Sequence, residues 1–322
     1  MSIGIGIDVV VCTYDNVASL ERVLGALARQ AVPAGVDWEV LVVDNNCTDA
    51  TPALLARLQD ERALPLRVVR ETEQGLTPAR RRGVAETRRE WIAFVDDDCL
   101  VAEDWIARAA EAAREHPAAG AVGGLVELEW EREPPPHVRD RGWAYARQDH
   151  GGEPVTVGCL AGAGMVIRRK ALEESGWTQR QLLADRVGHR LVSGGDVEIA
   201  LRVGAGHELW YDPRLRLRHL IPASRTADAY VARLVRGLGT SKLLGDTMLW
   251  PGGYRRWLVR SLRESTPFAR EAAVALRHRR PADARLALTF LRGWLAGIWR
   301  LLRADRDWRA ALLGSARPVR PG

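Results

Sequence analysis

The chain of 322 residues is 27% charged and 47% hydrophobic, with a formal net charge of +6. This length is enough to bury a sizeable core in one large domain, or in a domain with an appendage. The chain has no run of about 18 uninterrupted apolar residues, and its first residues lack the basic and long apolar regions of a secretory signal. We therefore expect neither a membrane-spanning helix nor a secretory signal.

Strand and helix patterns alternate through the first third of the chain. Short β-branched or apolar runs predict strands, and apolar residues at helical spacing predict helices between them. The predicted strands are residues 8–12, 38–43, 66–69 and 91–95, and the predicted helices are residues 17–30, 51–59 and 77–90. This alternation predicts right-handed βαβ units and a Rossmann-like, mostly parallel sheet, whose ligand lies at the carboxyl ends of the strands.

Polar side chains follow three of these predicted strands. They are Thr13 and Tyr14 after the first, Asp44 after the second, and Asp96, Asp97 and Asp98 after the fourth. A cluster of carboxylates repels itself unless a cation neutralises it, and Mg²⁺ or Mn²⁺ bridging the phosphates of a nucleotide is a common arrangement. The alternative is a solvated acidic turn at the start of the next helix.

Two known phosphate-binding patterns are missing from the sequence. No GxGxxG follows the first predicted strand, and GxxxxGK[ST] occurs nowhere in the chain. This disfavours a dinucleotide-dependent dehydrogenase and a P-loop enzyme.

Four segments, in this order, resemble the inverting glycosyltransferases of family 2, which have the GT-A nucleotide-diphospho-sugar transferase fold. Residues 10–15 resemble the opening strand and turn, and residues 41–49 resemble the second strand with its base-reading Asp. Residues 75–83 look like the Gly-Leu-Ser-x-Ala-Arg-x-x-Gly segment, and residues 96–98 match the DXD motif. The resemblance covers roughly residues 8–222 and implies an NDP-sugar-dependent hexosyltransferase of polysaccharide assembly.

The resemblance assigns seven residues to the nucleotide sugar: Thr13, Tyr14, Asp44, Arg80, Asp96, Asp97 and Gly162. Under this assignment Asp44 accepts a hydrogen bond from the base, Tyr14 stacks on the base and Asp96 holds the ribose. Arg80 pairs with the nucleotide or diphosphate, or is a solvated arginine at a helix start. Gly162 lies in residues 158–167, which resemble the family's glycine-bearing loop and strand, with an ordinary glycine-rich turn as the alternative.

The resemblance also implies a divalent cation, Mn²⁺ or Mg²⁺, bound by Asp98 and bridging the two phosphates. His219 follows a segment, residues 211–218, that resembles the strand ending the catalytic core, and it falls where many members complete the metal or diphosphate site. Imidazole suits Mn²⁺ better than Mg²⁺. The alternative is a structural histidine after a strand.

Asp196 falls on the position of the family's catalytic Asp, within residues 193–202. An acceptor hydroxyl is a poor nucleophile at neutral pH, so inversion by in-line displacement requires a base. A carboxylate that stabilises a helix N-terminus is the alternative. The sequence departs from the family at Gly195, where Glu is usual, so any role of that Glu is absent or supplied elsewhere, for example by Glu198.

Two segments are predicted to flank the acceptor. Residues 127–152 contain three consecutive prolines and read as a loop or short-helix excursion, and residues 179–190 are a second acceptor-side loop. Trp130 and Trp143 are suited to stacking on sugar faces, although surface packing explains them as well.

The last hundred or so residues differ from the rest in charge. Residues 224–322 hold 20 Lys and Arg against 7 Asp and Glu, whereas residues 1–223 hold 27 against 34. We therefore predict a catalytic domain over 1–223 and a basic helical extension over 224–322. Its predicted helices are residues 227–244, 255–263, 268–279 and 282–303.

The last of these helices is amphipathic. Leu286, Phe290, Trp294 and Ile298 share one face, followed by Leu301 and Leu302, with arginines interspersed. The face either lies on an anionic membrane surface close to a polyprenyl-linked acceptor, or packs in a helical bundle on the catalytic domain. Nucleic-acid binding ranks third, because no recognised motif accompanies the basic residues.

The sequence therefore predicts a metal-assisted, inverting glycosyltransferase that moves a sugar from an NDP-sugar to a saccharide or lipid-linked glycan, with Asp196 as base. The alternatives are a non-catalytic nucleotide- or glycan-binding pseudoenzyme, or a sugar nucleotidyltransferase, although the latter usually has a Gly-rich basic loop after the first strand. Four scattered cysteines without CxxC spacing favour buried thiols in a reducing compartment. We expect a cytoplasmic protein, either free or peripheral on the inner face of the cell membrane.

Overall fold

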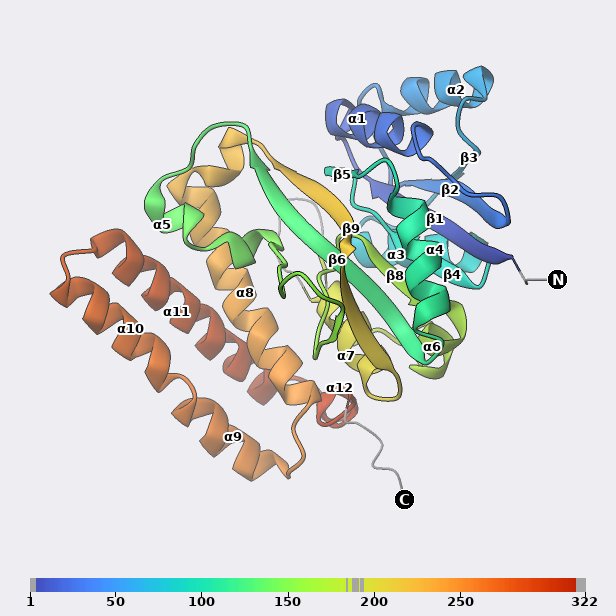
Figure 1. Cartoon of the computed structure of the whole chain (residues 1–322). Helices are drawn as coiled ribbons and strands as arrows, with labels where there is room; N and C mark the ends of the chain where they lie inside the picture. The colour runs from blue at the N-terminus through green and yellow to red at the C-terminus, as the bar shows by residue number, and fades with distance from the viewer. Residues whose placement is uncertain (1–3, 184, 187–190, 192–193, 317–322) are drawn as a thin grey trace.

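The computed structural model of the chain describes residues 4–183, 185–186, 191 and 194–316. Its centre is one sheet with helices on both faces, and a group of helices stands to one side of it (Figure 1). The strands follow the order β3-β2-β1-β4-β8-β6-β9-β5, and β7 pairs with β9. The predicted α/β fold with a helical C-terminal part is confirmed.

The first half of the sheet is parallel, as predicted. It consists of β1 (Ile5–Thr13), β2 (Val36–Asp44), β3 (Leu66–Arg70) and β4 (Trp91–Phe94), separated by α1 (Val17–Ala28), α2 (Thr51–Glu61) and α3 (Leu76–Glu86). Helix α3 ends four residues before the predicted limit at residue 90. The reason is that Thr87 is extended and the Asp8 carboxylate accepts hydrogen bonds from the backbone N–H groups of Arg88 and Arg89.

The second half of the sheet is mixed: it combines parallel and antiparallel pairs, whereas the pairs among the first four strands are all parallel. Its strands are β5 (Cys99–Val101), β6 (Ala119–Trp130), β7 (Val155–Thr156), β8 (Met165–Arg168) and β9 (Glu208–Ile221). β8 runs antiparallel to both β4 and β6, whereas β6 and β9 are parallel. Residues 127–130, predicted to belong to an excursion, are the end of β6, so that excursion begins only at Glu131.

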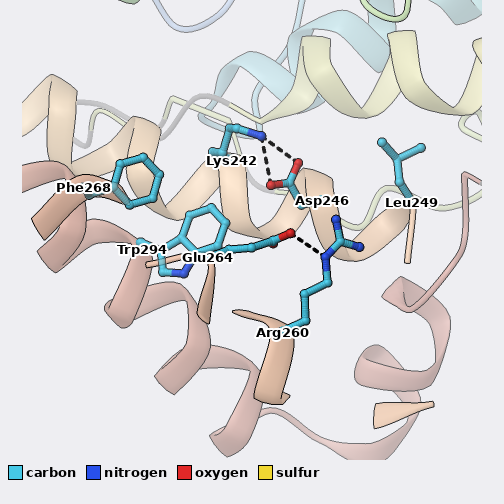
Figure 2. A pocket seen from close by; sticks show the side chains of 7 residues that line it. All are labelled: Lys242, Asp246, Leu249, Arg260, Glu264, Phe268 and Trp294. Atoms are coloured by element: carbon cyan, nitrogen blue, oxygen red, sulfur yellow. Dashed lines mark hydrogen bonds and ion pairs between the residues drawn. The ribbon is translucent and has the colours of Figure 1, made fainter. Parts of the chain in front are cut away.

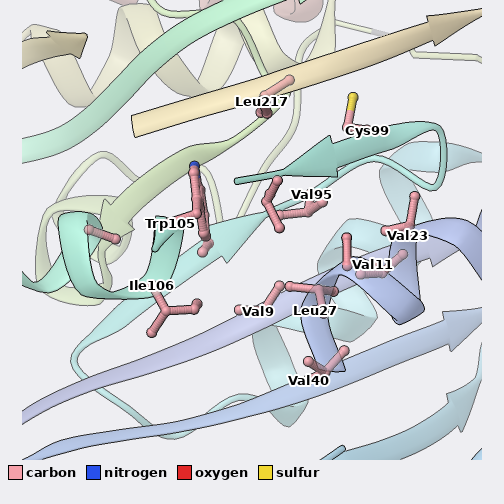
Figure 3. Close-up of a cluster of buried hydrophobic side chains, with 14 of the residues drawn as sticks. Val9, Val11, Val23, Leu27, Val40, Val95, Cys99, Trp105, Ile106 and Leu217 are labelled. Carbon is pink, nitrogen blue, oxygen red and sulfur yellow. The ribbon is translucent and has the colours of Figure 1, made fainter. Parts of the chain in front are cut away.

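The core has two layers, one on each face of the sheet. In β1 the side chains of Val9 and Val11 point to one face and pack with α1, α2 and α4 (Trp105–Glu115), as Figure 3 shows for part of this cluster. Val10 points to the other face and packs with α3, α6 (Arg169–Glu174) and α7 (Gly195–Gly204). The period of two along a buried strand therefore divides the hydrophobic residues between the two layers.

Short elements carry the chain between the long ones on the side of the sheet that faces the helical group. They are α5 (Pro136–Arg139) and η1 (Gly142–Tyr145) after β6, and η2 (Ala223–Thr226) after β9. Residues 184 and 187–190 of the predicted loop 179–190, and residue 193 of the segment around Asp196, lie outside the described residues.

The helical group comprises α8 (Asp228–Met248), α9 (Tyr254–Arg263), α10 (Thr266–Arg277), α11 (Pro281–Arg303) and α12 (Arg306–Leu312). The four predicted helices are confirmed, and α12 was not predicted. α8 and α11 lie side by side (Figure 1) and approach closely at Gly239 and Gly293, where an added Cβ would collide with the backbone of the other helix.

The predicted apolar face of α11 packs within this group and, at Leu286 and Phe290, in a cluster that also holds Val138, Tyr145 and Ile221. Leu286, Trp294, Ile298 and Leu301 are buried, Phe290 is partly buried, and Leu302 is exposed. This arrangement corresponds to the bundle alternative for that face. No helix in the described part of the chain is long and apolar enough to cross a membrane.

Candidate active site

A cleft of about 840 Å³ opens where β1 and β4 end. It gathers residues from several elements far apart in sequence, including the loop after β6 and the start of α7. Eight of the residues assigned from sequence line it: Thr13, Tyr14, Arg80, Asp96, Asp97, Asp98, Asp196 and His219. The expected convergence of strand ends therefore produces a single site.

The floor of the cleft is formed by the turn after β1 and the acidic triplet. Thr13 Oγ1 donates a hydrogen bond to Asp97 Oδ2 at 2.8 Å. Burial, with the neighbouring charge of Asp98, raises the pKa of Asp97 to about 7. Tyr14 is 45% exposed, so its ring is free to stack on a flat ligand.

Asp98 is buried and has three neighbours. Arg225 Nη1 lies 2.6 Å from Asp98 Oδ2, and His219 Nε2 lies 3.4 Å from Asp98 Oδ1. Burial alone would raise the pKa of Asp98, but His219 and Arg225 outweigh it and hold the pKa below its usual range. The sulfur of Cys99 also lies close to Asp98 and to the ring of His219.

These residues fit a divalent cation. His219 Nδ1 lies 2.8 Å from the carbonyl oxygen of Tyr145, so the ring donates its proton there and directs the Nε2 lone pair toward Asp98. Burial raises the pKa of Cys99 and keeps its thiol protonated, which leaves Asp98 Oδ1 and His219 Nε2 as the oxygen and nitrogen donors. Burial lowers the pKa of His219, but Asp98 outweighs it and raises the pKa, so a cation competes here with a proton.

Asp44 and Gly162 lie beside the cleft and are not among its lining residues. Asp44 Oδ1 accepts the backbone N–H of Cys47 at 2.8 Å. Its neighbour Asn45 lines the cleft and orders the loop before α3, because its Oδ1 accepts the N–H of Gly75 at 2.8 Å. Sequence reasoning missed this role of Asn45.

Arg80 extends from α3 into the cleft wall. Its side chain is almost fully buried, with Nη1 at 2.7 Å from Asp185 Oδ2 and Nη2 at 3.5 Å from Asp96 Oδ1. The guanidinium also lies over the Phe94 ring, 5.6 Å from its centroid. The alternative of a solvated arginine is therefore wrong for Arg80.

Asp196 stands in the first turn of α7 and touches the glycine-bearing loop. Its Oδ2 accepts the N–H of Gly162 at 3.3 Å, and its Oδ1 accepts the N–H of Val197 at 2.9 Å. A Cβ at position 162 would lie 2.5 Å from the Asp196 Cβ, so only glycine leaves room there. Asp196 therefore lines the cleft with its carboxylate held by backbone donors.

Glu198 does not replace the family Glu that is missing at position 195. It is fully buried, and its carboxylate accepts the N–H groups of Leu182 and Leu183 and pairs with Arg202 at 2.9 Å. These contacts use both oxygens to fix the chain before α7. The suggestion that Glu198 supplies an acceptor-binding role is therefore corrected, because the role of this buried carboxylate is structural.

Of the two tryptophans suggested for the acceptor, Trp143 is exposed and lines the cleft. Trp130 instead packs edge-on against Tyr145, with ring centroids 5.0 Å apart. Asp185, Arg186 and Arg225 also line the cleft and were not identified from the sequence, because no local pattern marks them.

A second, smaller hollow of about 400 Å³ lies within the helical group (Figure 2). Two ion pairs line it, Lys242 with Asp246 and Arg260 with Glu264. These four charges already neutralise one another, so this hollow has fewer unpaired charges than the cleft with which to bind a charged ligand.

A family model described as glycosyl transferase family 2 matches residues 8–176. The succinoglycan biosynthesis protein ExoM of Rhizobium meliloti is 32% identical over 117 residues, which are 36% of this chain and 38% of ExoM. A glucosyl-dolichyl phosphate glucuronosyltransferase of Haloferax volcanii is 26% identical over 260 residues, covering 76% of this chain and 78% of that protein. A second succinoglycan biosynthesis protein of Rhizobium meliloti, ExoO, is 37% identical over 117 residues, which are 36% of this chain and 32% of ExoO. The matches to ExoM and ExoO thus span less than half the length of either relative.

Two solved structures share the fold. The mannosyltransferase PcManGT from Pyrobaculum calidifontis, in complex with GDP-Man and Mn²⁺, gives a TM-score of 0.62 at 18% identity and covers 91% of this chain and 87% of that chain. S. aureus TarS 1-349 in complex with UDP-GlcNAc gives a TM-score of 0.52 at 14% identity, over 90% of this chain and 92% of that chain. At these identities the similarity shows the fold alone.

Proposed function

The chain belongs to glycosyl transferase family 2, and on that premise we propose that it transfers a sugar from an NDP-sugar to an acceptor hydroxyl with inversion. The observation that carries the proposal is the single cleft. It joins the acidic triplet, an exposed tyrosine, a buried arginine and the Asp196 carboxylate, which come from separate parts of the sequence.

In this proposal the donor nucleotide lies against the end of the parallel strands. Tyr14 stacks on the base, Asp44 offers its remaining oxygen, Oδ2, to the base edge, and Asp96 binds the ribose. Gly162 gives the donor sugar room to approach the backbone, while Asp97 and Thr13 hold the floor of the site. Arg80 stabilises the diphosphate through its guanidinium.

Asp98 and His219 are proposed to hold a divalent cation, Mn²⁺ or Mg²⁺, which supplies Lewis-acid stabilisation to the diphosphate when bound. Arg225 orients the Asp98 carboxylate through the oxygen that does not face His219. The mixed oxygen and nitrogen donors favour Mn²⁺.

Asp196 is proposed as the general base. Its carboxylate accepts the proton of the acceptor hydroxyl as that oxygen attacks the anomeric carbon of the sugar. The new carbon–oxygen bond forms as the bond to the diphosphate breaks, and the electron pair leaves with the nucleoside diphosphate. Attack from the face opposite the leaving group inverts the anomeric configuration.

We propose a saccharide or lipid-linked glycan as the acceptor, because the exposed Trp143 and the loop after β6 line the cleft. The names of the relatives support this class, since they include succinoglycan biosynthesis proteins and a glucosyl-dolichyl phosphate glucuronosyltransferase.

A peripheral membrane location is part of the same proposal. The exposed side of α11 carries large apolar residues at helical spacing, Leu288, Leu295, Trp299 and Leu302. They are accompanied by Arg292, Arg300 and Arg303. Arg285 is paired with Asp228, and Asp283, the helix's acidic residue, is paired with Arg141. An apolar stripe flanked by arginines suits the interface of an anionic membrane, where a lipid-linked acceptor would be found.

The test is release of nucleoside diphosphate from a panel of NDP-sugars, with and without glycan acceptors, by wild type, Asp196→Asn and the surface control Asp60→Asn. We expect turnover by wild type and Asp60→Asn, and a loss of about 10²-fold or more in Asp196→Asn, the scale of general base catalysis. Nucleotide binding without turnover in any combination would instead support the pseudoenzyme alternative.

A further inference from the structure

The buried carboxylate of Asp185 occupies a space that the glycine at position 195 leaves empty. A Cβ built on Gly195 would lie 2.5 Å from Asp185 Oδ2 and 3.1 Å from its Cγ. The backbone of Gly195 is helical and its φ is not positive, so the conformation does not require glycine. The lack of a side chain at position 195 is therefore explained by the Asp185 carboxylate beside it.

Asp185 is bound on both oxygens. Oδ2 accepts from Arg80 Nη1 at 2.7 Å, and Oδ1 accepts the N–H of Arg186 at 3.0 Å. Only about 5% of the residue is exposed, although it lines the cleft. The Arg80 guanidinium is therefore the ion-pair partner of Asp185.

Arg80 stands among several acidic groups. Burial alone would lower the pKa of Arg80, but Asp185, Asp96 and Asp196 together outweigh it and raise the pKa. Cys12, on β1, also faces Arg80, and Asp185 faces Asp196 and Arg186 as well as Arg80. Asp196 is therefore within electrostatic reach of the guanidinium.

Asp196 nevertheless has no hydrogen bond to an arginine in the described part of the chain, because its two acceptor bonds there come from backbone N–H groups. A carboxylate in direct contact with a guanidinium is a poor general base, since the ion pair stabilises its ionised form. Something must hold Arg80 off Asp196, and Asp185 is the group in contact with its Nη1.

We propose that Asp185 is a positioning residue: its ion pair holds Arg80 in the wall of the cleft, away from Asp196, so that Asp196 is free to act as base. The carboxylate of Asp185 fits there because Gly195 has no side chain. This inference rests on the proposed transferase function. It assigns the carboxylate that the sequence lacks at position 195 to a different segment of the chain.

The proposal predicts that positions 185 and 195 are exchangeable. In aspartate, standard bond lengths place a carboxylate oxygen about 2.4 Å from Cβ. Position 195 would therefore put an oxygen close to the present site of Asp185 Oδ2, provided that Asp185 is removed. Gly195→Asp alone would place two carboxylates in one space.

The experiment compares wild type, Asp185→Asn, Asp185→Gly, Gly195→Asp, the double variant Asp185→Gly/Gly195→Asp and the surface control Asp60→Asn. For each, kcat and donor KM are measured across pH, and the free energy of unfolding is measured in urea. We expect kcat to fall by about tenfold or more in each single variant of the pair, and to recover to within about threefold of wild type in the double variant. In Asp185→Asn the acidic limb of the kcat profile moves to lower pH, because Arg80 then acts on Asp196 without a competing carboxylate.

Three results would decide against the inference or its premise. Wild-type kcat and pH profile in Asp185→Asn would overturn the positioning role. A folded double variant no better in kcat and stability than the single variants would overturn the exchange. If folded wild type turns over no donor, the proposed function fails, while recovery of stability in the double variant would still support the Asp185–Arg80 arrangement by itself.

Discussion

In the proposed cation site, the ring of His219 is oriented by its second nitrogen. The Tyr145 carbonyl accepts a hydrogen bond from Nδ1 at 2.8 Å, and the ring is buried, so the Nε2 lone pair is fixed toward Asp98. The backbone of a residue in η1 thus sets the direction of a donor on β9. The loop after β6 therefore orients a residue of the proposed cation site without supplying a ligand itself.

Replacing His219 should weaken binding of the cation. We expect His219→Ala to reduce Mn²⁺ affinity by at least about tenfold, measured by the electron paramagnetic resonance signal of free Mn²⁺. His207→Ala is the matched control, since His207 pairs with Glu174 on the surface. Equal Mn²⁺ affinity in the two variants would remove His219 from the site.

Asp185 should give the stability of the protein a distinctive pH dependence. Burial raises the pKa of Asp185 to about 6, with Arg80 opposing and Asp196 reinforcing the rise. In the unfolded chain an aspartic acid titrates near about 3.9, so the native state binds this proton more tightly. The contribution to stability is fully present below about pH 4 and is lost as the pH rises through about 6.

The measurement is urea unfolding of wild type and Asp185→Asn between pH 4 and pH 7. We expect the free energy of unfolding of wild type, minus that of the variant, to decrease over this range by on the order of 1–3 kcal/mol. Asp60→Asn, an exposed control, should show no such trend. If this difference increased with pH, the ion pair with Arg80, and not burial, would determine the pKa of Asp185.

At the scale of elements, α11 has two apolar sides with different surroundings. Trp294 is 2% exposed and donates its indole N–H to the Ser261 carbonyl at 2.8 Å, whereas Trp299, one turn and a little further along, is 60% exposed. A tryptophan is therefore buried on one side of α11 and exposed to solvent on the other.

These two tryptophans form a matched pair for a stability test. We expect Trp294→Ala to lower the free energy of unfolding by about 3–5 kcal/mol, because it leaves a cavity and an unpaired carbonyl. Trp299→Ala should change it by less than about 0.5 kcal/mol. Similar losses from both substitutions, in urea unfolding of the whole chain, would contradict this packing of α11.

Elements whose apolar residues follow a clear helical or strand spacing were predictable from the sequence, and elements without such a spacing were not. The four parallel strands and four helices of the C-terminal part follow from apolar runs and helical spacing. β6 was missed because its first half, Ala119–Gly124, consists largely of Ala and Gly, which carry little β signal, although it is buried between β8 and β9.

The site was predictable only where it follows a motif. The residues after β1 and β4, and Asp196 at the start of α7, lie in recognisable segments and meet in the cleft. Asp185 and Arg225 depend on contacts with partners 105 and 127 positions away, at Arg80 and Asp98. Pairings over such distances are set by the fold and leave no local pattern.

For the whole molecule, the division between a catalytic domain, 1–223, and an extension, 224–322, stays a prediction. One hydrophobic cluster includes Leu182, Leu183 and Leu201 from before residue 223 together with Leu243 and Trp294 from after it. Trp308 also donates its indole N–H to the Leu182 carbonyl at 3.1 Å. The helical group therefore packs on the segment that leads to Asp185 and on the helix that begins beside Asp196.

The exposed stripe of α11 gives a test of membrane association. We expect the intact protein to co-sediment with vesicles containing phosphatidylglycerol, and much less with vesicles of phosphatidylcholine alone, because the arginines require an anionic surface. Leu295→Ser/Trp299→Ser should reduce this binding at least about tenfold, and the control Val155→Ser, which replaces an exposed valine of β7, should not. Equal binding by the two variants would mean that another surface is responsible, and no binding by wild type would reject the peripheral location.

We propose above that the cleft binds an NDP-sugar together with a divalent cation held by Asp98. The most direct measurement is thermal unfolding of wild type and Asp98→Asn with a panel of nucleoside diphosphates and NDP-sugars, in Mn²⁺, in Mg²⁺ and in EDTA. A ligand that binds the native state raises its apparent stability, so we predict a higher melting temperature with one nucleotide class, lost in EDTA and in Asp98→Asn. If no nucleotide raises the melting temperature of the folded wild type, the cleft is not a nucleotide-sugar site.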